Sequence, residues 1–101
     1  MQVRVLREAC CAQDDQLGPL EATYEVGQSA TIGDLVLAIV ESRFLQYSSS
    51  HTSLVAFVGG QPIVRVFSSY YAPGREPEFM LPSAKLTTAV VGNQPIEFRF
   101  V

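Results

Sequence analysis

The apolar and polar residues of this chain follow two different periods, and the change between them locates one helix. From Ile32 onward, apolar residues recur at helical spacing. Thr31 stands at the position of a helix N-cap, and Asp34 follows three residues later, the spacing of a capping box. The pattern predicts an amphipathic helix over residues 32–43, with Arg43 beside the negative end of the helix dipole.

On both sides of this helix, apolar residues alternate with polar ones, which is typical of half-buried strands. The sequence predicts strands over residues 1–7, 20–26, 54–58, 63–67 and 96–100. The first two are expected to form a hairpin whose loop is residues 9–19. Residues 86–91 fit either one helical turn or a short strand, and the proline-containing segment 68–82 is predicted to be a loop.

A single amphipathic helix among strands has to pack its apolar stripe on a sheet, because neither element can bury its apolar face alone. A chain of 101 residues has room for one domain and one core. We therefore predict an α+β fold with a single domain over residues 1–101.

Several segments resemble the ubiquitin-like β-grasp superfamily. Residues 1–5 resemble its first strand, Thr31 and Ile32 open the helix as the family does, and residues 54–61 resemble the strand and tight turn that follow. Residues 96–101, with Leu86 before them, resemble the end of the fold. The resemblance implies a β-grasp domain in which a mixed sheet of four to five strands packs on one amphipathic helix.

The C-terminal residues bear on what the resemblance implies for function. Conjugated ubiquitin-like proteins, and the sulfur carriers that resemble them, end in Gly-Gly, whereas this chain ends in Phe-Arg-Phe-Val. This favours a non-covalent protein–protein interaction module, an adaptor or small subunit of a larger assembly. Two alternatives stay open: a ubiquitin-like or sulfur-carrier-like protein modified at a processed C-terminus, and a small inhibitor or immunity-type protein.

The charge and hydropathy of the chain argue against nucleic acid and membrane as its partners. The net charge is -3 and the arginines are scattered without forming a basic run, so nucleic-acid binding has little electrostatic support. No apolar run approaches the roughly 20 residues of a membrane helix, and the first residues lack a signal-peptide pattern. We expect a cytoplasmic protein whose partner is another protein, with a second copy of the chain also open.

Few residues have the chemistry of a catalytic or metal site. His51 is the one histidine, and the serines at 48–50 lie too close to it along the chain to suggest a triad. Cys10 and Cys11 are adjacent, which favours free thiols in a reducing compartment, and with His51 they do not make a zinc site. We expect no enzymatic activity, no cofactor and no metal.

Tyr70, Tyr71 and Arg75 are the strongest candidates for partner binding, because Tyr and Arg supply large contact areas and directional hydrogen bonds. The alternative is that one tyrosine plugs the edge of the core while the other is merely exposed. Glu97 and Arg99, the outward residues of the last predicted strand, join the candidates. The exposed edge of a β-grasp sheet is a further candidate, through addition of a strand.

Overall fold

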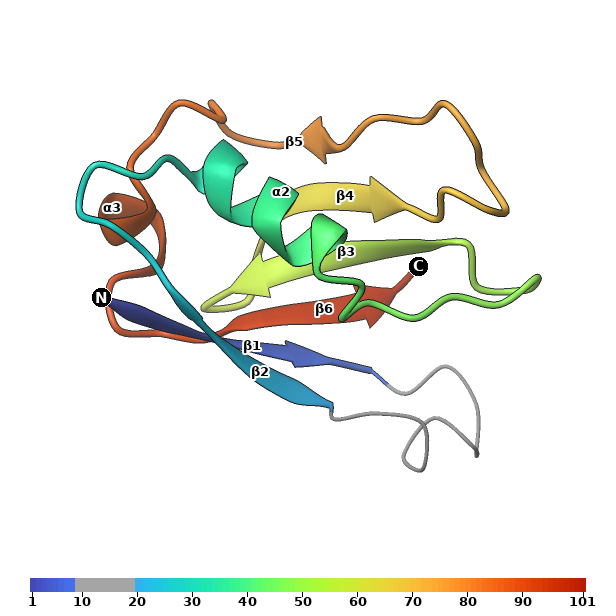
Figure 1. Ribbon diagram of the computed structural model, residues 1–101, viewed down its shortest axis with the longest axis horizontal. Helices are drawn as coiled ribbons and strands as arrows, with labels where there is room; N and C mark the ends of the chain where they lie inside the picture. The colour runs from blue at the N-terminus through green and yellow to red at the C-terminus, as the bar shows by residue number, and fades with distance from the viewer. Residues whose placement is uncertain (9–19) are drawn as a thin grey trace.

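The structure is a computed structural model that describes residues 1–8 and 20–101. Six strands and two helices lie within those residues (Figure 1). In chain order they are β1 (Gln2–Arg7), β2 (Glu21–Glu25), α2 (Ile32–Glu41), β3 (Ser53–Val58), β4 (Gln61–Phe67), β5 (Glu78–Phe79), α3 (Thr87–Val91) and β6 (Ile96–Phe100). The prediction of an α+β fold is confirmed.

All six strands form one mixed sheet in the order β2-β1-β6-β3-β4-β5. β1 and β2 form the predicted hairpin, and β1 runs parallel to β6, with Val5 opposite Ile96. The remaining neighbours are antiparallel. The last strand of the chain is therefore inserted between the first strand and β3.

Two details of the predicted fold are wrong. The expected four to five strands become six, because the segment 68–82, predicted as a loop, contains β5, which pairs with β4. A strand of two residues is too short to show an alternation, so the sequence carries no period for it. The expected single helix is joined by α3, which settles the open choice at residues 86–91 in favour of a helical turn.

The core lies between α2 and the sheet face that it covers (Figure 1). The helix buries Ile32, Leu35, Val36 and Ile39, the stripe expected from the helical spacing. Facing side chains come from the central strands and include Val5, Leu54 and Phe98, all at most 1% exposed. We call the opposite side of the sheet the outer face; it carries the alternate residues of the same strands.

Backbone and side-chain acceptors satisfy the first N–H groups of α2. The predicted capping box is present: the Asp34 N–H donates to Thr31 Oγ1 and the Thr31 N–H donates to Asp34 Oδ2, each at 3.1 Å. The N–H groups of Ile32 and Gly33 donate to the carbonyl oxygens of Lys85 (2.8 Å) and Ser83 (3.0 Å). The start of α2 is therefore bonded directly to the segment that leads into α3.

The helix ends at Glu41, two residues earlier than predicted. Ser42 is the C-cap, and its hydroxyl lies 2.7 Å from the Ile39 carbonyl oxygen, to which it donates. Arg43 then adopts a left-handed backbone with φ of 60°, a common way for a helix to stop. Arg43 therefore lies outside the last turn, and its predicted place at the helix dipole is wrong.

The other predicted strands agree with the structure to within about two residues. The predicted loop at 9–19, with Cys10 and Cys11, falls outside the described residues. Neither described helix has the length and apolar character needed to cross a membrane.

Two substitutions in α2 test the helix assignment. Thr31→Ala should lower the free energy of unfolding by about 1 kcal/mol, because it removes the cap. Ile39→Ala should lower it by about 2–5 kcal/mol, because it leaves a cavity under the helix. Denaturant unfolding measures both. Leu37→Ala, at a position that is 57% exposed on the same helix, is the control and should change stability by less than about 0.5 kcal/mol. Equal, negligible losses at Thr31 and Ile39 would contradict the assignment.

Candidate partner-binding site

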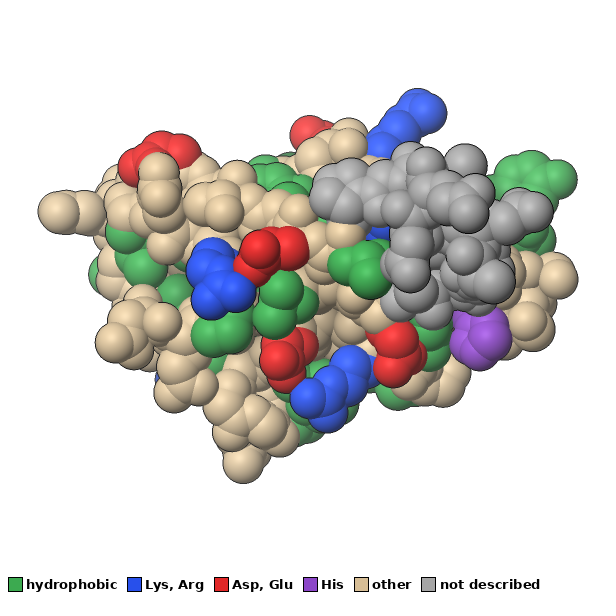
Figure 2. Space-filling view, turned by 90° about the horizontal axis from the view of Figure 1, so that it is seen from below, with side chains coloured by type: hydrophobic (Ala, Val, Ile, Leu, Met, Phe, Trp, Pro, Cys, Tyr) green, Lys and Arg blue, Asp and Glu red, His purple; other side chains and the backbone are tan. Residues whose placement is uncertain are grey.

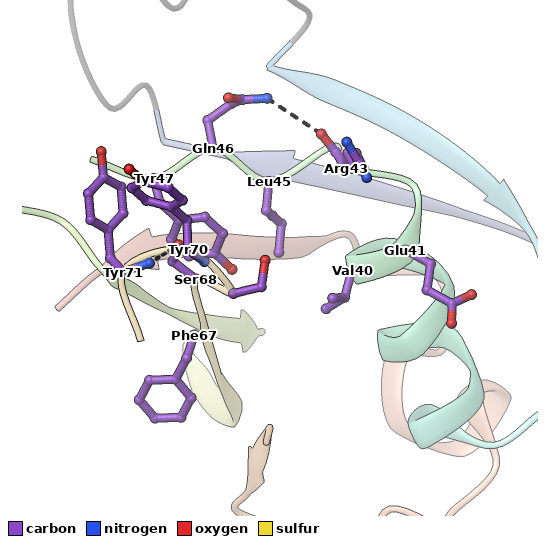
Figure 3. A pocket seen from close by; sticks show the side chains of 11 residues that line it. Val40, Glu41, Arg43, Leu45, Gln46, Tyr47, Phe67, Ser68, Tyr70 and Tyr71 are labelled. Atoms are coloured by element: carbon purple, nitrogen blue, oxygen red, sulfur yellow. Dashed lines mark hydrogen bonds between the residues drawn. The ribbon is translucent and has the colours of Figure 1, made fainter. Parts of the chain in front are cut away.

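An open groove of about 690 Å³ lies between the end of α2 and the turn that follows β4 (Figure 3). Residues from two stretches of the chain, distant in sequence, line it: Val40, Glu41, Arg43, Leu45, Gln46 and Tyr47 from the first, and Phe67, Ser68, Ser69, Tyr70 and Tyr71 from the second. Its wall thus combines three tyrosines with one acidic and one basic side chain. We call this feature the tyrosine groove.

Tyr70 and Tyr71 are both exposed at this groove, by 82% and 43%. Their rings meet edge to face, with the ring centroids 4.8 Å apart and the planes at 84°. Neither ring belongs to the core. The alternative in which one tyrosine plugs the edge of the core is therefore wrong, and the pair presents apolar surface to solvent.

Ser68 fixes the backbone that carries the tyrosine pair. It is 3% exposed, and its Oγ accepts hydrogen bonds from the N–H groups of Tyr70 (3.2 Å) and Tyr71 (3.1 Å). Its carbonyl oxygen accepts from the Ala72 N–H at 2.9 Å, and its own N–H donates to the Thr52 carbonyl oxygen at 2.9 Å. The turn is thereby bonded to the residue that precedes β3.

Tyr47 supplies the third ring of the groove from the segment after α2 (Figure 3). Its side chain is half-buried, and this burial raises the pKa of its phenol from 10.0 to about 12. Leu45, two residues earlier, is 7% exposed and belongs to the core. The groove floor is therefore continuous with the core of the domain.

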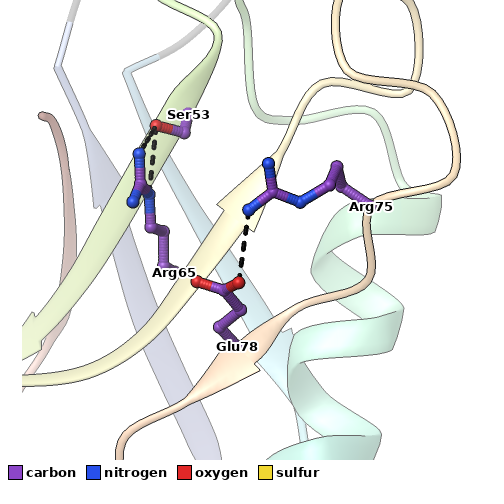
Figure 4. A network of polar contacts seen from close by, with 4 residues as sticks. All are labelled: Ser53, Arg65, Arg75 and Glu78. Carbon is purple, nitrogen blue, oxygen red and sulfur yellow. Dashed lines mark hydrogen bonds and ion pairs between the residues drawn. The ribbon is translucent and has the colours of Figure 1, made fainter.

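Arg75 lies on the outer face, next to the groove. Its guanidinium carbon is 4.0 Å from the centroid of the Phe67 ring, and its Nη2 is 3.2 Å from Glu78 Oε2 (Figure 4). Arg65 approaches the same ring at 5.1 Å while donating to Ser53 Oγ. Phe67 also lines the groove, but its ring points away from Tyr70 and Tyr71 in Figure 3, so Arg75 contacts this residue from the outer face.

Glu97 and Arg99 lie elsewhere on the outer face, on β6. Arg99 Nη2 is 2.9 Å from Glu97 Oε2, and its guanidinium carbon is 5.2 Å from the Phe57 ring centroid. In the sheet register, Val55 stands opposite both Arg99 and Arg65, so β3 separates this pair from β4. Of the five candidate residues, Tyr70 and Tyr71 are in ring contact, Arg75 lies on the outer face against Phe67, and Glu97 and Arg99 lie apart on β6.

The charged side chains of this surface form small pairs of opposite sign. Figure 2, which looks at the molecule from the β2 side, shows acidic and basic side chains next to one another with apolar side chains beside them. The ion pairs Arg75–Glu78 and Arg99–Glu97 are largely exposed, so each contributes little to stability. What they do is hold the two guanidinium groups over phenyl rings.

Sequence reasoning missed Tyr47, Arg65 and Phe57 as parts of these surfaces. The alternation in residues 63–67 could have shown that Arg65 and Phe67 share a face. The proximity of Phe57 to Arg99 depends on β3 pairing with β6, and that of Tyr47 to Tyr70 depends on the path of two loops. Neither contact can be predicted from a local sequence pattern.

Other chemistry is sparse in the described residues. His51 Nδ1 lies 3.3 Å from both Ser48 Oγ and Ser50 Oγ, and its ring lies 4.6 Å from that of Phe100. These contacts belong to one tight turn, and within residues 1–8 and 20–101 no acidic side chain bonds to the imidazole. The same part of the chain contains no group of three potential metal ligands.

No family model, curated protein or solved structure matches this chain. Function is therefore inferred from the geometry of the tyrosine groove and the outer face.

Ser68→Ala tests how the tyrosine pair is held. The change leaves two partly buried backbone N–H groups without their acceptor, so the free energy of unfolding should fall by about 1 kcal/mol. The amides of Tyr70 and Tyr71 should also exchange with solvent faster, as measured by hydrogen exchange. Ser69→Ala, at an exposed neighbour, is the control and should change neither quantity. Unaltered exchange at both tyrosines would show that Ser68 does not fix the turn.

The raised pKa of Tyr47 makes a prediction about alkaline stability. Between pH 10 and 12, the unfolded chain ionises this phenol while the folded protein keeps it protonated until about 12. The folded state then binds more protons, so the free energy of unfolding falls as the pH rises. In Tyr47→Phe this fall should be shallower over the same pH range, measured by urea unfolding at each pH. Identical slopes in the wild type and in Tyr47→Phe would refute the effect.

Proposed function

We propose that this protein is a non-covalent protein–protein interaction module, whose partner binds at Tyr70, Tyr71 and Arg75 beside the tyrosine groove. The observation that carries the proposal is the exposed tyrosine pair, whose backbone is bonded to a buried serine. Large exposed rings in a monomeric domain are typical of a surface that another molecule covers.

The energetics of such a surface favour binding. A tyrosine buries a large area while losing the freedom of only two side-chain torsions, so ordering it on binding costs little. Here the turn is already ordered by Ser68, and the Arg75 guanidinium is already placed against Phe67. A preformed surface leaves more of the contact energy for affinity.

The outer face extends this surface toward Glu97 and Arg99. These two side chains are ion-paired with each other, and Arg99 lies against Phe57. At the rim of an interface, such charges affect orientation and the rate of association more than affinity. In the proposed interface, the tyrosine pair anchors the partner and the β6 charges select its orientation.

We also propose that the fold is a ubiquitin-like β-grasp. Support comes from the β1–β2 hairpin followed by α2, and from β6 lying parallel to β1 in the middle of the sheet. The added β5 and the Tyr70 segment are where this domain departs from the simplest form of that fold. A cytoplasmic setting is part of the proposal, supported by the adjacent cysteines at 10 and 11, which favour free thiols.

A triple variant tests the binding site. Tyr70→Ala/Tyr71→Ala/Arg75→Ala should weaken partner binding by about 30-fold or more, because hot-spot side chains of these types carry most of an interface's energy. Affinity is measured on the partner that co-purifies with the wild type from the native source. The control Arg4→Ala/Met80→Ala removes a cation and an exposed apolar side chain away from the groove and should bind normally.

Unchanged affinity in the folded triple variant would show that these three residues are not the binding site.

The nature of the function is tested separately by the intact mass of the native protein after incubation with an activating enzyme. The mass should stay the same, and an adenylate or a new isopeptide product would overturn the interaction-module proposal in favour of a carrier modified at its C-terminus.

A further inference from the structure

β2 is one edge of the sheet, and within the described residues it pairs with β1 alone (Figure 1). Two bonds at its ends fix which of its backbone groups face β1. The Arg7 N–H donates to the Leu20 carbonyl oxygen at 2.9 Å, and the Val26 N–H donates to the Met1 carbonyl oxygen at 2.7 Å. In an antiparallel pair, residues that bond to the neighbour alternate with residues that do not.

This alternation assigns the backbone groups of β2. Ala22 and Tyr24, in step with residues 20 and 26, bond to β1. Glu21, Thr23 and Glu25 therefore direct their N–H and C=O groups away from β1, toward the free side of the strand. Among the described residues, nothing bonds to these groups. They form a row of donors and acceptors that another strand could pair with.

Several features that protect edge strands are missing from β2. Residues 21–25 contain no proline and no lysine, and their pairing with β1 runs without a bulge. The only charged side chains are Glu21 and Glu25, both exposed. The edge can therefore pair with another strand, and the negative charge of Glu21 and Glu25 restricts which sequences that strand can have.

The charges disfavour a second copy of this chain as the occupant. Two copies of β2 paired antiparallel about Thr23 would place Glu21 of one copy opposite Glu25 of the other, twice. Like charges directly opposite each other on neighbouring strands are destabilising. An incoming strand with basic residues at these two places would instead face the carboxylates at a Cα separation of about 5.5 Å.

The side of β2 that faces α2 indicates which residues the incoming strand should have between its two basic residues. Ala22 and Tyr24 are half-buried there, and the Tyr24 ring meets that of Phe44 edge to face at 6.5 Å. The Tyr24 hydroxyl and Ser42 Oγ are 2.7 Å apart, which holds this ring in place. A strand added to β2 would lay its alternate side chains beside these rings, where apolar residues would extend the core.

We propose that the free edge of β2 binds an extended segment of another protein by strand addition. The segment has Lys or Arg opposite Glu21 and Glu25, four residues apart, and apolar residues at the two positions that flank the central one. This site goes beyond the proposed function, because it uses none of the residues of the tyrosine groove.

The two carboxylates already have partners within the domain. Glu21 Oε1 lies 2.5 Å from Arg4 Nη2, and Glu25 Oε1 lies 3.4 Å from the N-terminal amine. Both carboxylates stay exposed, by 49% and 72% of their side chains. A carboxylate can accept several hydrogen bonds, so an incoming cation can share each of them.

The test uses a synthetic peptide, Lys-Val-Thr-Val-Lys with two serines at each end and blocked termini. On binding to the full chain, it should slow amide exchange at Glu21, Thr23 and Glu25 at least tenfold, and change Ala22 and Tyr24 less, because these already bond to β1. A peptide with glutamates in place of its lysines should bind at least tenfold more weakly. The difference between the two peptides should shrink with added salt.

Thr23→Pro is the matched variant. Its lost N–H points to the free side, so the pairing with β1 is kept, and proline is tolerated on edge strands in that position. Affinity for the lysine peptide should fall about tenfold or more. A lysine peptide N-methylated at its central residue loses the other bond of the same pair, the one from its own N–H to the Thr23 carbonyl oxygen. It should bind wild-type protein as weakly, and this comparison holds even if Thr23→Pro does not fold. The Tyr70→Ala/Tyr71→Ala/Arg75→Ala variant should bind the lysine peptide normally.

Several outcomes would overturn the proposal. They are absence of binding, binding without protection of the three edge amides, equal affinity for the lysine and glutamate peptides, and normal affinity for the N-methylated peptide. A dimer of the wild type, seen by sedimentation and abolished by Thr23→Pro, would show that a second copy occupies the edge instead.

Discussion

The structure depends on the hydrogen bonds that the free N–H groups in the first turn of α2 make. Its N–H groups find acceptors in the Thr31 side chain and in the carbonyl oxygens of Ser83 and Lys85, on a segment fifty residues away. Gly33 allows this approach, because a Cβ at that position would lie 3.2 Å from the Ser83 carbonyl oxygen. One end of the helix is thereby bonded to the segment that leads into α3, while its apolar stripe packs on the sheet along its length. Both the tyrosine groove at the other end of α2 and the position of β2 beside Phe44 follow from this placement.

The two binding surfaces that we propose lie where regular structure ends or lacks a neighbour. The tyrosine groove forms where α2 ends at Glu41 and β4 ends at Phe67, and partly buried hydrogen bonds order the turn that follows β4. The edge of β2 is regular, but within residues 1–8 and 20–101 no second strand pairs with its outward backbone groups. One surface offers aromatic side chains and the other offers backbone groups, so they suit partners of different kinds and can be occupied independently.

Periodic segments of the sequence were predictable, and contacts between segments were not. Thr31, Asp34 and the stripe through Ile39 predict α2, and the alternation in β1, β2 and β6 predicts those strands, because each signal is contained in a few neighbouring residues. β5 escaped prediction because two residues have no period, and the early end of α2 depends on the left-handed backbone at Arg43. Tyr70 and Tyr71 could be chosen from their chemistry alone. Tyr47 could not, since only the path of two loops brings it to the same groove.

The insertion of β6 between β1 and β3 has a consequence for how the chain folds. A chain synthesised only as far as residue 95 has its first hairpin, its long helix and the β3–β4 pair, but no strand joins them into one sheet. Contacts of such long sequence separation form late, after the entropy of closing the loop between them has been lost. Until β6 arrives, the open edges of β1 and β3 remain exposed to other chains. Both edges are paired within the sheet only once residues 96–100 are in place.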